Sequence, residues 1–516
     1  MECSVATRVV ARDGWRLFRL RKLCARMDSF DANGKSFGEV NFGMAELGDV
    51  RRTRRLVTLA NQIVRHPGGS LPHKLCNPAD LTALYRLCQR DEVTHEAVLA
   101  PHRQVVWQQI QEHSGDVLVL HDSTDIDYTR QKSLSELGQI GDGHGRGYIV
   151  QNSLAVCAKT GHVIGLTNQI LHRRAHVAKN ETRAQKRVRE SRESRLWVQG
   201  TEGLPADWKL VDVCDRGADT CEFIEHEVHS GRRFVIRTQH NRRIVPGHEA
   251  PSAQALEKGP CLHRFVRTLP SQGDFELDVT KSIPAGKSAK ARKKNGKLKH
   301  PLRTARLAPM CFAAAAVWLV PPDARSGQHG KAPLPVWVVR VWEPNPPAGE
   351  EALEWILITN EPVLTETDAL RIIQWYRMRW VIEEYHKAQK TGCNVEGMHF
   401  QYEERLKPMI ALMSIVALTL LRLRDAARAA DAKTRLAREF IGDDYVAALS
   451  LWRHKEVRLN WSVHDFILAL GRMGGHLNRR RDGLPGWITL WRGWTDLQPR
   501  VDTADLLQQI DEKRCA

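Results

Sequence analysis

The side chains best suited to chemistry on a phosphodiester lie in residues 376–390, YRMRWVIEEYHKAQK, a segment without Pro or Gly. The segment is predicted to form one α-helix, with roughly 3.6 residues per turn. A single stripe of that helix, an arc of roughly 80°, would carry a carboxylate, three cations and a phenol. These are Glu383, Arg379, Lys387, Lys390 and Tyr376. The carboxylate could bind a metal ion while the cations bind non-bridging phosphate oxygens. The alternative is a solvated face with i,i+4 charge pairs, each worth a few tenths of a kcal/mol.

Two aspartates far from this helix are the candidate partners of Glu383. Asp122 ends the apolar segment 116–122 and Asp215 ends the apolar segment 209–215, and both segments predict buried strands. Because ligands gather at the carboxyl ends of strands in open α/β sheets, the two aspartates are expected to face one site. Three carboxylates suit Mg²⁺, which prefers hard oxygen ligands, and Mn²⁺ could replace it. Two such ions would activate the attacking oxygen and stabilise the leaving one.

The elements around these aspartates predict an α/β core. Strands are expected at residues 116–122, 148–157, 163–171, 209–215 and 234–238, with helices at 181–198 and 220–229. Between residues 239 and 350 the alternation stops, and Pro, Gly and β-prone runs predict an inserted β-rich subdomain. The whole block, including the helix at 376–390, would span residues 113–400.

The block before the core, residues 37–112, is predicted to be a small helical DNA-binding domain. Asp49 stands where a helix N-cap belongs, and apolar residues follow it at helical spacing. Four arginines crowd the first turns of this helix, where the helix dipole disfavours cations. They are Arg51, Arg52, Arg54 and Arg55. A DNA backbone would offset that charge, and a solvated basic face is the alternative.

The chain as a whole is basic. Its 516 residues include 77 Lys or Arg and 60 Asp or Glu, a formal net charge of +17 that favours a polyanionic partner, most simply nucleic acid. Residues 281–306 carry ten Lys or Arg and no acid, which predicts a loop that either contacts DNA phosphates or is only solvated. Residues 1–36 form a basic extension, expected to be a disordered arm or the product of a misassigned start.

Other classes of protein fit the sequence less well. The 11 cysteines contain no C-x-x-C pair, which predicts free thiols in a reducing compartment and argues against zinc. The longest apolar runs fall short of the roughly 20 residues of a membrane span. No G-x-x-x-x-G-K-[ST] loop occurs, so a bound nucleotide cofactor is not expected. Residues 401–516 are predicted to be helical, with a tryptophan-bearing tail that suits a partner surface.

The order of these motifs resembles a known family. Tyr376-x2-Arg379-x3-Glu383-x6-Lys390 is similar to the Tyr-Arg-Glu-Lys signature of the DDE transposases of the insertion-sequence-four family. The Asp-Ser-Thr that begins at residue 122 resembles that family's first acidic motif, and VCDRGAD resembles its second. Similar stretches include LGDVRRTRRLV, RRFVIR, WILITNEPV and GRMGGHLNRRRDG. The resemblance runs in colinear order from about residue 37 to residue 498.

The resemblance implies both a fold and an activity. The fold would be a ribonuclease-H-like α/β core with a β-rich insertion, between N-terminal and C-terminal helical domains. The activity would be Mg²⁺-dependent cut-and-paste DNA transposition, in which transposon ends are nicked, closed into hairpins, reopened and joined to target DNA. A catalytically silent DNA-binding inhibitor, or a domesticated derivative, is the alternative. The implied location is the bacterial cytoplasm, at the nucleoid.

The resemblance also implies roles for single residues. Two metal ions would be held by Asp122, Asp215 and Glu383. Phosphates near the cut would be held by Tyr376, Arg379, Lys387, Lys390 and Arg237. Trp355 would stack on a flipped base, with a core strand tryptophan as the alternative. The arginines of the N-terminal helix would bind terminal inverted repeats of double-stranded DNA. Residues 401–516 would form a homodimer, so that each subunit cuts the end its partner holds.

Overall fold

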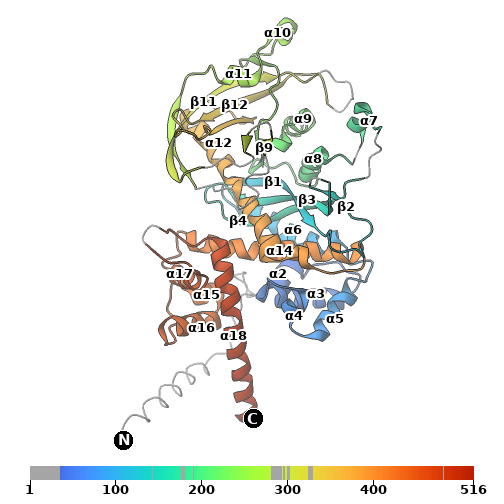
Figure 1. The fold of residues 1–516 in the computed structure, drawn as a ribbon, viewed down its shortest axis with the longest axis vertical. Coiled ribbons are helices and arrows are strands. Elements are labelled where there is room, and N and C mark those ends of the chain that lie inside the picture. Colours follow the sequence, from blue (N-terminus) through green and yellow to red (C-terminus); the bar gives the residue numbers. More distant parts are fainter. Residues whose placement is uncertain are drawn as a thin grey trace.

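The computed structural model describes residues 35–141, 143–175, 180–189, 191–280, 293–294, 297–298, 303–322, 329–479 and 482–515. Figure 1 shows a large sheet with its helices in the upper part of the molecule and two groups of helices side by side below it. The extension at 1–36 falls almost wholly outside the described residues, and so does most of the basic loop expected at 281–306, of which residues 293–294, 297–298 and 303–306 are described; their roles stay predictions.

In the part of the chain that the structure describes, five helices precede the sheet: α2 (Phe37–Phe42), α3 (Val50–Arg65), α4 (Leu71–Leu75), α5 (Pro78–Leu87) and α6 (His95–Glu112). The predicted N-cap of α3 is confirmed, because the Asp49 side chain accepts a hydrogen bond from the backbone N–H of Arg51. Leu56, Leu59 and Ile63 recur at helical spacing on α3 and are buried, so this stripe faces the core. The opposite face carries the arginines.

The first strands form a mixed sheet. They are β1 (Val117–Asp127), β2 (Gly138–Ile140), β3 (Gly145–Cys157), β4 (Val163–His172), β5 (Leu210–Cys214) and β6 (Arg233–Arg237). In space the order is β4-β3-β1-β5-β6, with β2 on the edge of β3. β3 is antiparallel to both β1 and β4, whereas β5 is parallel to both β1 and β6. The expected mixed α/β architecture is therefore present.

Most strands of the inserted region continue this sheet, next to the strand β13 that follows the insertion. Beyond β6 the order is β13 (Glu354–Thr359), β12 (Leu334–Trp342), β11 (Arg306–Leu319) and β7 (Ile244–Pro246), with β8 (Gly273–Val279) also on β11. The short helices α10 (Ala253–Lys258) and α11 (Leu262–Val266) lie at the top of Figure 1. A two-stranded ribbon, β9 (Lys293–Lys294) and β10 (Lys297–Leu298), belongs to the same region.

The helix expected at residues 376–390 is interrupted twice. α12 (Glu366–Met378) ends before Arg379, α13 (Trp380–Lys387) starts after it, and Ala388–Gly392 form a π-helical turn. Thr365 caps α12 with a reciprocal capping box to Asp368. Arg379 itself keeps helical backbone angles and forms the expected i,i+4 pair with Glu383, so uniform 100° spacing fails only from the π-turn onward. A π-turn adds a residue to its turn, which shifts every side chain that follows.

Two other expectations about elements need correction. β1 runs on to Asp127, so Asp122 lies in the middle of the strand and not at its end. The helix expected at 181–198 is broken into α7 (Arg183–Val188), a 3₁₀ turn at Glu193–Arg195 and α8 (Leu196–Thr201). The helix expected at 220–229 is present as α9 (Cys221–His229), capped by the Thr220 hydroxyl.

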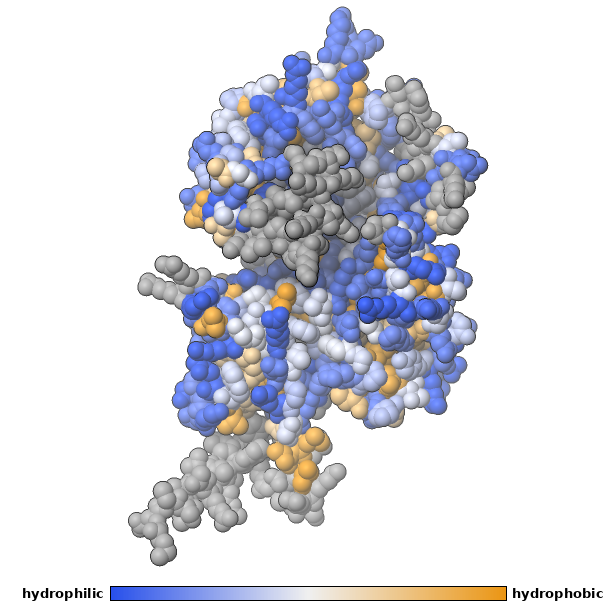
Figure 2. Space-filling view, in the orientation of Figure 1, coloured by the Kyte–Doolittle hydropathy of each residue, from blue (hydrophilic) through white to orange (hydrophobic). Residues whose placement is uncertain are grey.

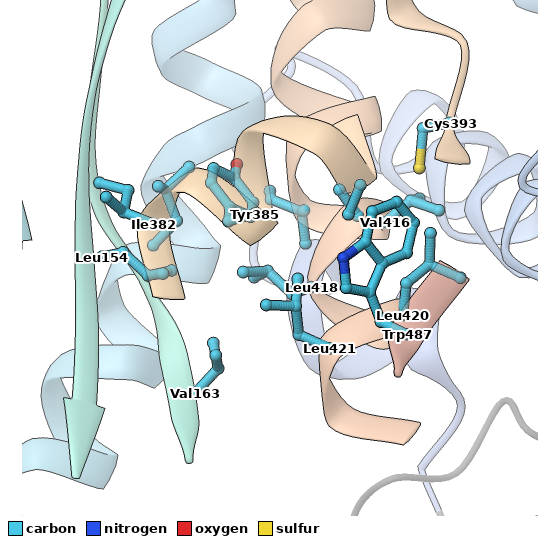
Figure 3. Packing of buried hydrophobic residues seen from close by; sticks show 14 of the residues in the cluster. Leu154, Val163, Ile382, Tyr385, Cys393, Val416, Leu418, Leu420, Leu421 and Trp487 are labelled. Atoms are coloured by element: carbon cyan, nitrogen blue, oxygen red, sulfur yellow. The ribbon is translucent and has the colours of Figure 1, made fainter. Parts of the chain in front are cut away.

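A long apolar helix, α14 (Glu403–Arg428), lies between the sheet and the lower helices in Figure 1. Its length and composition would suit a membrane span, but 89% of its most apolar window is buried inside the protein. Figure 3 shows Val416, Leu418 and Leu420 of α14 packed near Tyr385 of α13 and Trp487. α14 is thus the core element that supports α13 from behind.

The C-terminal helices gather on one side of the lower part (Figure 1). They are α15 (Ala437–Ile441), α16 (Asp443–His454), α17 (Val463–Met473) and α18 (Trp487–Cys515). Gly442, with φ of 100°, separates α15 from α16 in a stretch expected to be one helix. The end of α18 projects away from the body, and Leu506, Leu507 and Ile510 are exposed on it. Figure 2 shows a mostly hydrophilic surface with apolar residues at this tip.

Candidate active site

Two neighbouring strands place Asp122 beside Asp215. β1 and β5 pair in parallel, and the last matched residues are His121 and Cys214. The next residues along the two strands are the two aspartates. Matched positions on parallel strands point to the same face of the sheet, at a strand spacing of about 4.8 Å. The two carboxylates therefore leave the sheet together.

Asp215 is fixed by the turn that follows it. Its side chain caps the 3₁₀ turn Arg216–Ala218 and accepts a hydrogen bond from the Gly217 N–H at 2.7 Å. A Cβ atom at residue 217 would lie 2.8 Å from the ring of Trp197 and 3.0 Å from the Asp215 carboxylate. Glycine is thus required here for the turn to approach the carboxylate so closely.

Arg379 joins the strand to the helix. Its Nη1 lies 3.2 Å from Asp122 Oδ2, and its Nη2 lies 2.5 Å from Glu383 Oε1. Arg379 is the residue between α12 and α13, and it reaches Glu383 at the i,i+4 spacing of a helix face because its backbone angles are helical. The Arg379 guanidinium therefore bridges Asp122 and Glu383.

The surroundings of Asp122 disfavour its charged form. Burial raises the pKa of Asp122 from 3.8 to about 7, because the charged form loses its water. Arg379 opposes this rise, whereas the negative charges of Asp215 and Glu383 add to it. The side chains of Asp122 and Glu383 are 18% and 29% exposed, so the cluster opens to solvent on one side. One cation thus balances three carboxylates incompletely.

The donor set fits a hard divalent cation. Within the described ranges, no group of three or more His, Cys, Asp or Glu side chains is already arranged to hold a metal ion. Arg379 lies between two of the three carboxylates and supplies positive charge there. All three donors are oxygens and they carry a surplus of negative charge, which is the chemistry that Mg²⁺ requires.

Three of the predicted phosphate-binding or base-stacking residues lie beside this cluster. Tyr376 lies close enough to Arg379 to raise the pKa of the guanidinium. The ring of Trp355, from β13, meets the Tyr376 ring edge-on, with centroids 5.7 Å apart. Arg237 on β6 donates a hydrogen bond from Nη2 to the backbone oxygen of Glu354, at 3.1 Å. Trp355 is only partly buried, so it is not a fully enclosed core residue.

The two lysines of the predicted stripe lie elsewhere. Lys387 is exposed, and its ammonium lies 5.1 Å from the ring centre of Trp380, itself 54% exposed. Lys390 sits in the π-turn, and its Nζ lies 4.0 Å from Glu396 Oε1. Neither lysine forms an ion pair with the three acidic residues in the part of the chain described. Lys387 is one turn from Glu383 on α13, and the predicted binding of phosphates by both lysines stays a prediction.

The four N-terminal arginines differ in their partners. Arg51 is 84% exposed and pairs with Asp49, at 2.8 Å. Arg52 pairs with Glu92, and Arg55 pairs with Asp80 at 3.3 Å. Arg54 is exposed and forms no ion pair with the residues described. The charge near the helix start is thus partly balanced inside the block, and Arg51 and Arg54 remain open to a ligand.

A buried charged network behind the site was missed at the sequence level. His121 Nε2 lies 2.7 Å from Asp212 Oδ1, and Arg232 Nε lies 2.7 Å from Asp212 Oδ2. Although burial opposes it, Arg232 and His121 hold the pKa of Asp212 below its usual value. Burial and the Asp212 charge raise the pKa of Glu227 well above its usual range. Ser153 Oγ completes the network, 2.9 Å from His121 Nδ1.

This network lies directly beneath the two aspartates. His121 precedes Asp122 on β1, and Asp212 precedes Asp215 on β5 by three residues. The available signal was an aspartate inside an otherwise apolar strand, LVDVC, which has to find a partner when buried. Nothing local in the sequence identifies Arg232 as that partner, because Arg232 lies just before β6, 20 positions further along the chain.

The N-terminal helices match a known type of domain. Residues 35–93 match a family model described as transposase DNA-binding. The match covers α2 to α5 together with the exposed Arg51 and Arg54. The chain therefore carries a DNA-binding block of the kind found in transposases, which supports a transposase that binds DNA.

Proposed function

We propose that this protein is a Mg²⁺-dependent DDE DNA transposase of the insertion-sequence-four type. The observation that carries the proposal is that Arg379 pairs with both Asp122 and Glu383, while Asp215 directly follows the strand β5 that lies beside Asp122. These residues come from two parallel strands and one helix, and they lie in a chain that also has a transposase-type DNA-binding block.

The order of the strands supports a ribonuclease-H-like core. The order β4-β3-β1-β5-β6 places three parallel strands beside two antiparallel ones. The candidate carboxylates occupy the two central strands, β1 and β5. The third carboxylate comes from a helix that α14 supports.

The side chains around the carboxylates suit a phosphodiester substrate. Arg379 presents a planar fork of donors that matches phosphate oxygens as well as it matches carboxylates. Tyr376 adds a phenol next to it, and Trp355 adds an aromatic edge. When bound, Mg²⁺ would activate the attacking hydroxyl and stabilise the leaving oxygen. Asp122, Asp215 and Glu383 would hold it.

Arg379 has to change partners for this chemistry. In the protein alone, its two Nη atoms occupy Asp122 and Glu383. A DNA phosphate would offer the guanidinium an equivalent bidentate partner. Arg379 would then leave the carboxylates as the substrate arrives, so substrate binding would make them available to the metal.

Cut-and-paste transposition through a hairpin, within a homodimer, completes the proposal. Trp355 is partly exposed beside Tyr376, as a base-stacking residue needs to be. The projecting end of α18 exposes Leu506, Leu507 and Ile510, which a second subunit could cover. Such a protein would act on double-stranded DNA in the bacterial cytoplasm.

The deciding experiment uses Asp215→Asn, which keeps the size of the side chain and removes its charge. The variant should bind DNA that carries the inverted repeats flanking the gene, but cleave it on the order of 10³-fold more slowly with Mg²⁺. Asp127→Asn, a change at an exposed aspartate of the same strand, should cut normally.

Two results would contradict the proposal. Undiminished cleavage by Asp215→Asn would remove this residue from the chemistry. A wild-type protein that binds these ends but never cuts them would identify the catalytically silent DNA-binding protein instead.

A further inference from the structure

A second basic surface lies outside the carboxylate cluster, in the seam between the N-terminal helices and the catalytic block. It is a groove of about 550 Å³, lined among others by Arg130, Lys132, Arg405 and His399. Tyr85 of α5 forms one wall and Phe400 another. No carboxylate lines the groove, and none of its three permanent cations forms an ion pair with another described residue.

The floor of the groove is rigid. Residues 128–136, which follow β1, are bound to residues 395–403, which follow the π-turn. Tyr128 Oη donates to the Val395 backbone oxygen at 3.0 Å, and Ser133 Oγ donates to that of Phe400 at 3.1 Å. The buried Gln131 amide also donates to the backbone oxygen of Met398. The cations are thus carried on a fixed frame.

The same frame links the groove to the acidic cluster. The segment with Arg130 and Lys132 continues directly from the strand that carries Asp122. Glu396 accepts a hydrogen bond from the Asp127 N–H at 3.0 Å and lies 4.0 Å from Lys390. A ligand held in the groove would therefore be held at a fixed position relative to Asp122 and the π-turn.

The far wall belongs to the DNA-binding block. Tyr85 packs edge-on against Phe400, with ring centroids 5.4 Å apart, so α5 is joined to the groove. Tyr85 and Gln89 both fall within the residues that match the transposase DNA-binding family. Arg405 lies over the ring of Tyr402, which is 54% exposed. Cations and exposed aromatic rings together suit a sugar–phosphate backbone.

We propose that this seam groove, with Arg130, Lys132 and Arg405, binds the sugar–phosphate backbone of the DNA that the N-terminal block holds. It would keep that duplex aligned between the N-terminal block and the acidic cluster. Three cations that form no ion pair with a described residue, in a groove whose lining holds no carboxylate, carry the assignment, because such a surface complements a polyanion. The inference rests on the proposed function only in taking DNA as the ligand.

The test replaces Arg130, Lys132 and Arg405 together by Gln and measures DNA binding over a range of salt concentrations. The slope of log K against log salt is negative, and each lost phosphate contact makes it less steep by about 0.9. The slope of the triple variant should therefore be less steep than that of the wild type by about 2 to 3. The matched control replaces Lys433, Arg453 and Arg472, exposed cations of the C-terminal helices, by Gln. Its slope should stay as in the wild type.

Two duplexes separate backbone binding from base reading. One carries the inverted repeat that flanks the gene, and the other has an unrelated sequence. Because phosphates carry no sequence information, the slope should fall equally on both. A slope that matches the control variant on either duplex, or that falls only on the inverted repeat, would overturn the inference.

A parallel cleavage assay distinguishes this inference from the proposed function. A wild-type protein that binds both duplexes but never cuts would refute the catalytic proposal and leave the groove inference standing. Efficient cutting by the wild type, with a salt slope in the triple variant that equals the wild-type slope, would refute the groove inference and leave the catalytic proposal standing. Circular dichroism and a thermal melt establish that the triple variant is folded.

Discussion

Arg379 holds Asp122 and Glu383 with opposite ends of one guanidinium, at 3.2 and 2.5 Å. The arrangement keeps two like charges close together without a metal ion. Their mutual repulsion and their burial nevertheless remain visible in the raised pKa of Asp122. At the scale of single residues, the site is thus strained electrostatically, and both partners of Arg379 offer a test.

Arg379→Gln should strengthen metal binding in the absence of DNA. The substitution removes the cation that competes for Asp122 and Glu383, so the affinity for Mn²⁺ should rise by about tenfold, about 1.4 kcal/mol. Titration followed by electron paramagnetic resonance measures the free ion. Arg377→Gln, at an exposed neighbour, should leave the affinity unchanged. An equal or weaker affinity in Arg379→Gln would show that Arg379 does not compete.

Asp122→Asn should stabilise the protein in a pH-dependent way. The native pKa of about 7 lies above the usual 3.8, so the native state keeps a proton that the unfolded chain has lost. Wild-type stability therefore falls as pH rises through this window, and the full cost is present above it. The Asn variant should gain about 1–3 kcal/mol at pH about 8, and progressively less as pH falls toward 4.

Urea unfolding at several pH values measures this gain. Asp127→Asn, on the exposed part of β1, should show no such pH dependence. A gain for Asp122→Asn that is the same at every pH would mean that Asp122 titrates normally in the folded protein.

At the scale of elements, close packing of glycines joins α17 to α18. A Cβ atom at Gly493 would lie 2.0 Å from the backbone oxygen of Leu470, and one at Gly474 would lie 1.9 Å from that of Thr489. Backbone atoms cannot rotate away as a side chain can. The two helices can therefore approach this closely only where both surfaces lack side chains.

Gly493→Ala should push α18 away from α17 and destabilise the protein by about 1–3 kcal/mol. Chemical denaturation measures the loss. Gly486→Ala is the matched control, since nothing lies within 4 Å of the added methyl group. Equal stability of the two variants would mean that the helices adjust to the extra atom without cost.

Elements were easier to predict than their interruptions. The strand at Leu210–Cys214 and the cap at Asp49 follow from local residue types, and both are predicted. The break at Arg379 was not, because no Pro or Gly marks it. The π-turn at Ala388–Gly392 was missed for the same reason: its geometry depends on how Gly392 packs against Leu420 of α14, which local spacing does not show.

The site shows the same limit. The sequence led to Asp122, Asp215 and Glu383 through motifs, and the parallel register of β1 and β5 explains why the two aspartates meet. Lys390 lies within the π-turn, where uniform helical spacing does not hold, whereas Lys387 precedes the turn on α13. The buried partner Arg232 and the cations of the seam groove depend on contacts between distant segments. Those contacts become visible only once the strands are ordered.

At the scale of the whole molecule, the end of α18 presents apolar side chains to solvent. Leu506 and Leu507 are 59% and 48% exposed on a helix that projects from the body. An apolar tip of this kind favours association with a second copy. Such a contact would leave each subunit's own DNA-binding block free.

Leu507→Lys should therefore weaken pairing of two DNA ends without weakening the binding of one end. Light scattering coupled to size exclusion, in the presence of end DNA, should show a single protein chain on a single duplex. Ile488→Lys, a change at a partly exposed residue near the start of the same helix, should pair ends normally. Paired complexes of undiminished mass with Leu507→Lys would exclude this tip as the interface.

Lys74 is buried in the DNA-binding block and donates to the backbone oxygens of Pro67 and Cys393, the latter at 2.9 Å and 319 positions further along the chain. Trp494 similarly donates to the backbone oxygen of Arg65, 429 positions earlier. While the ribosome is still making the second half of the polypeptide, these partners do not yet exist. The N-terminal helices are therefore synthesised early but reach their final packing late. A nascent chain should reach its full affinity for DNA only near the end of translation.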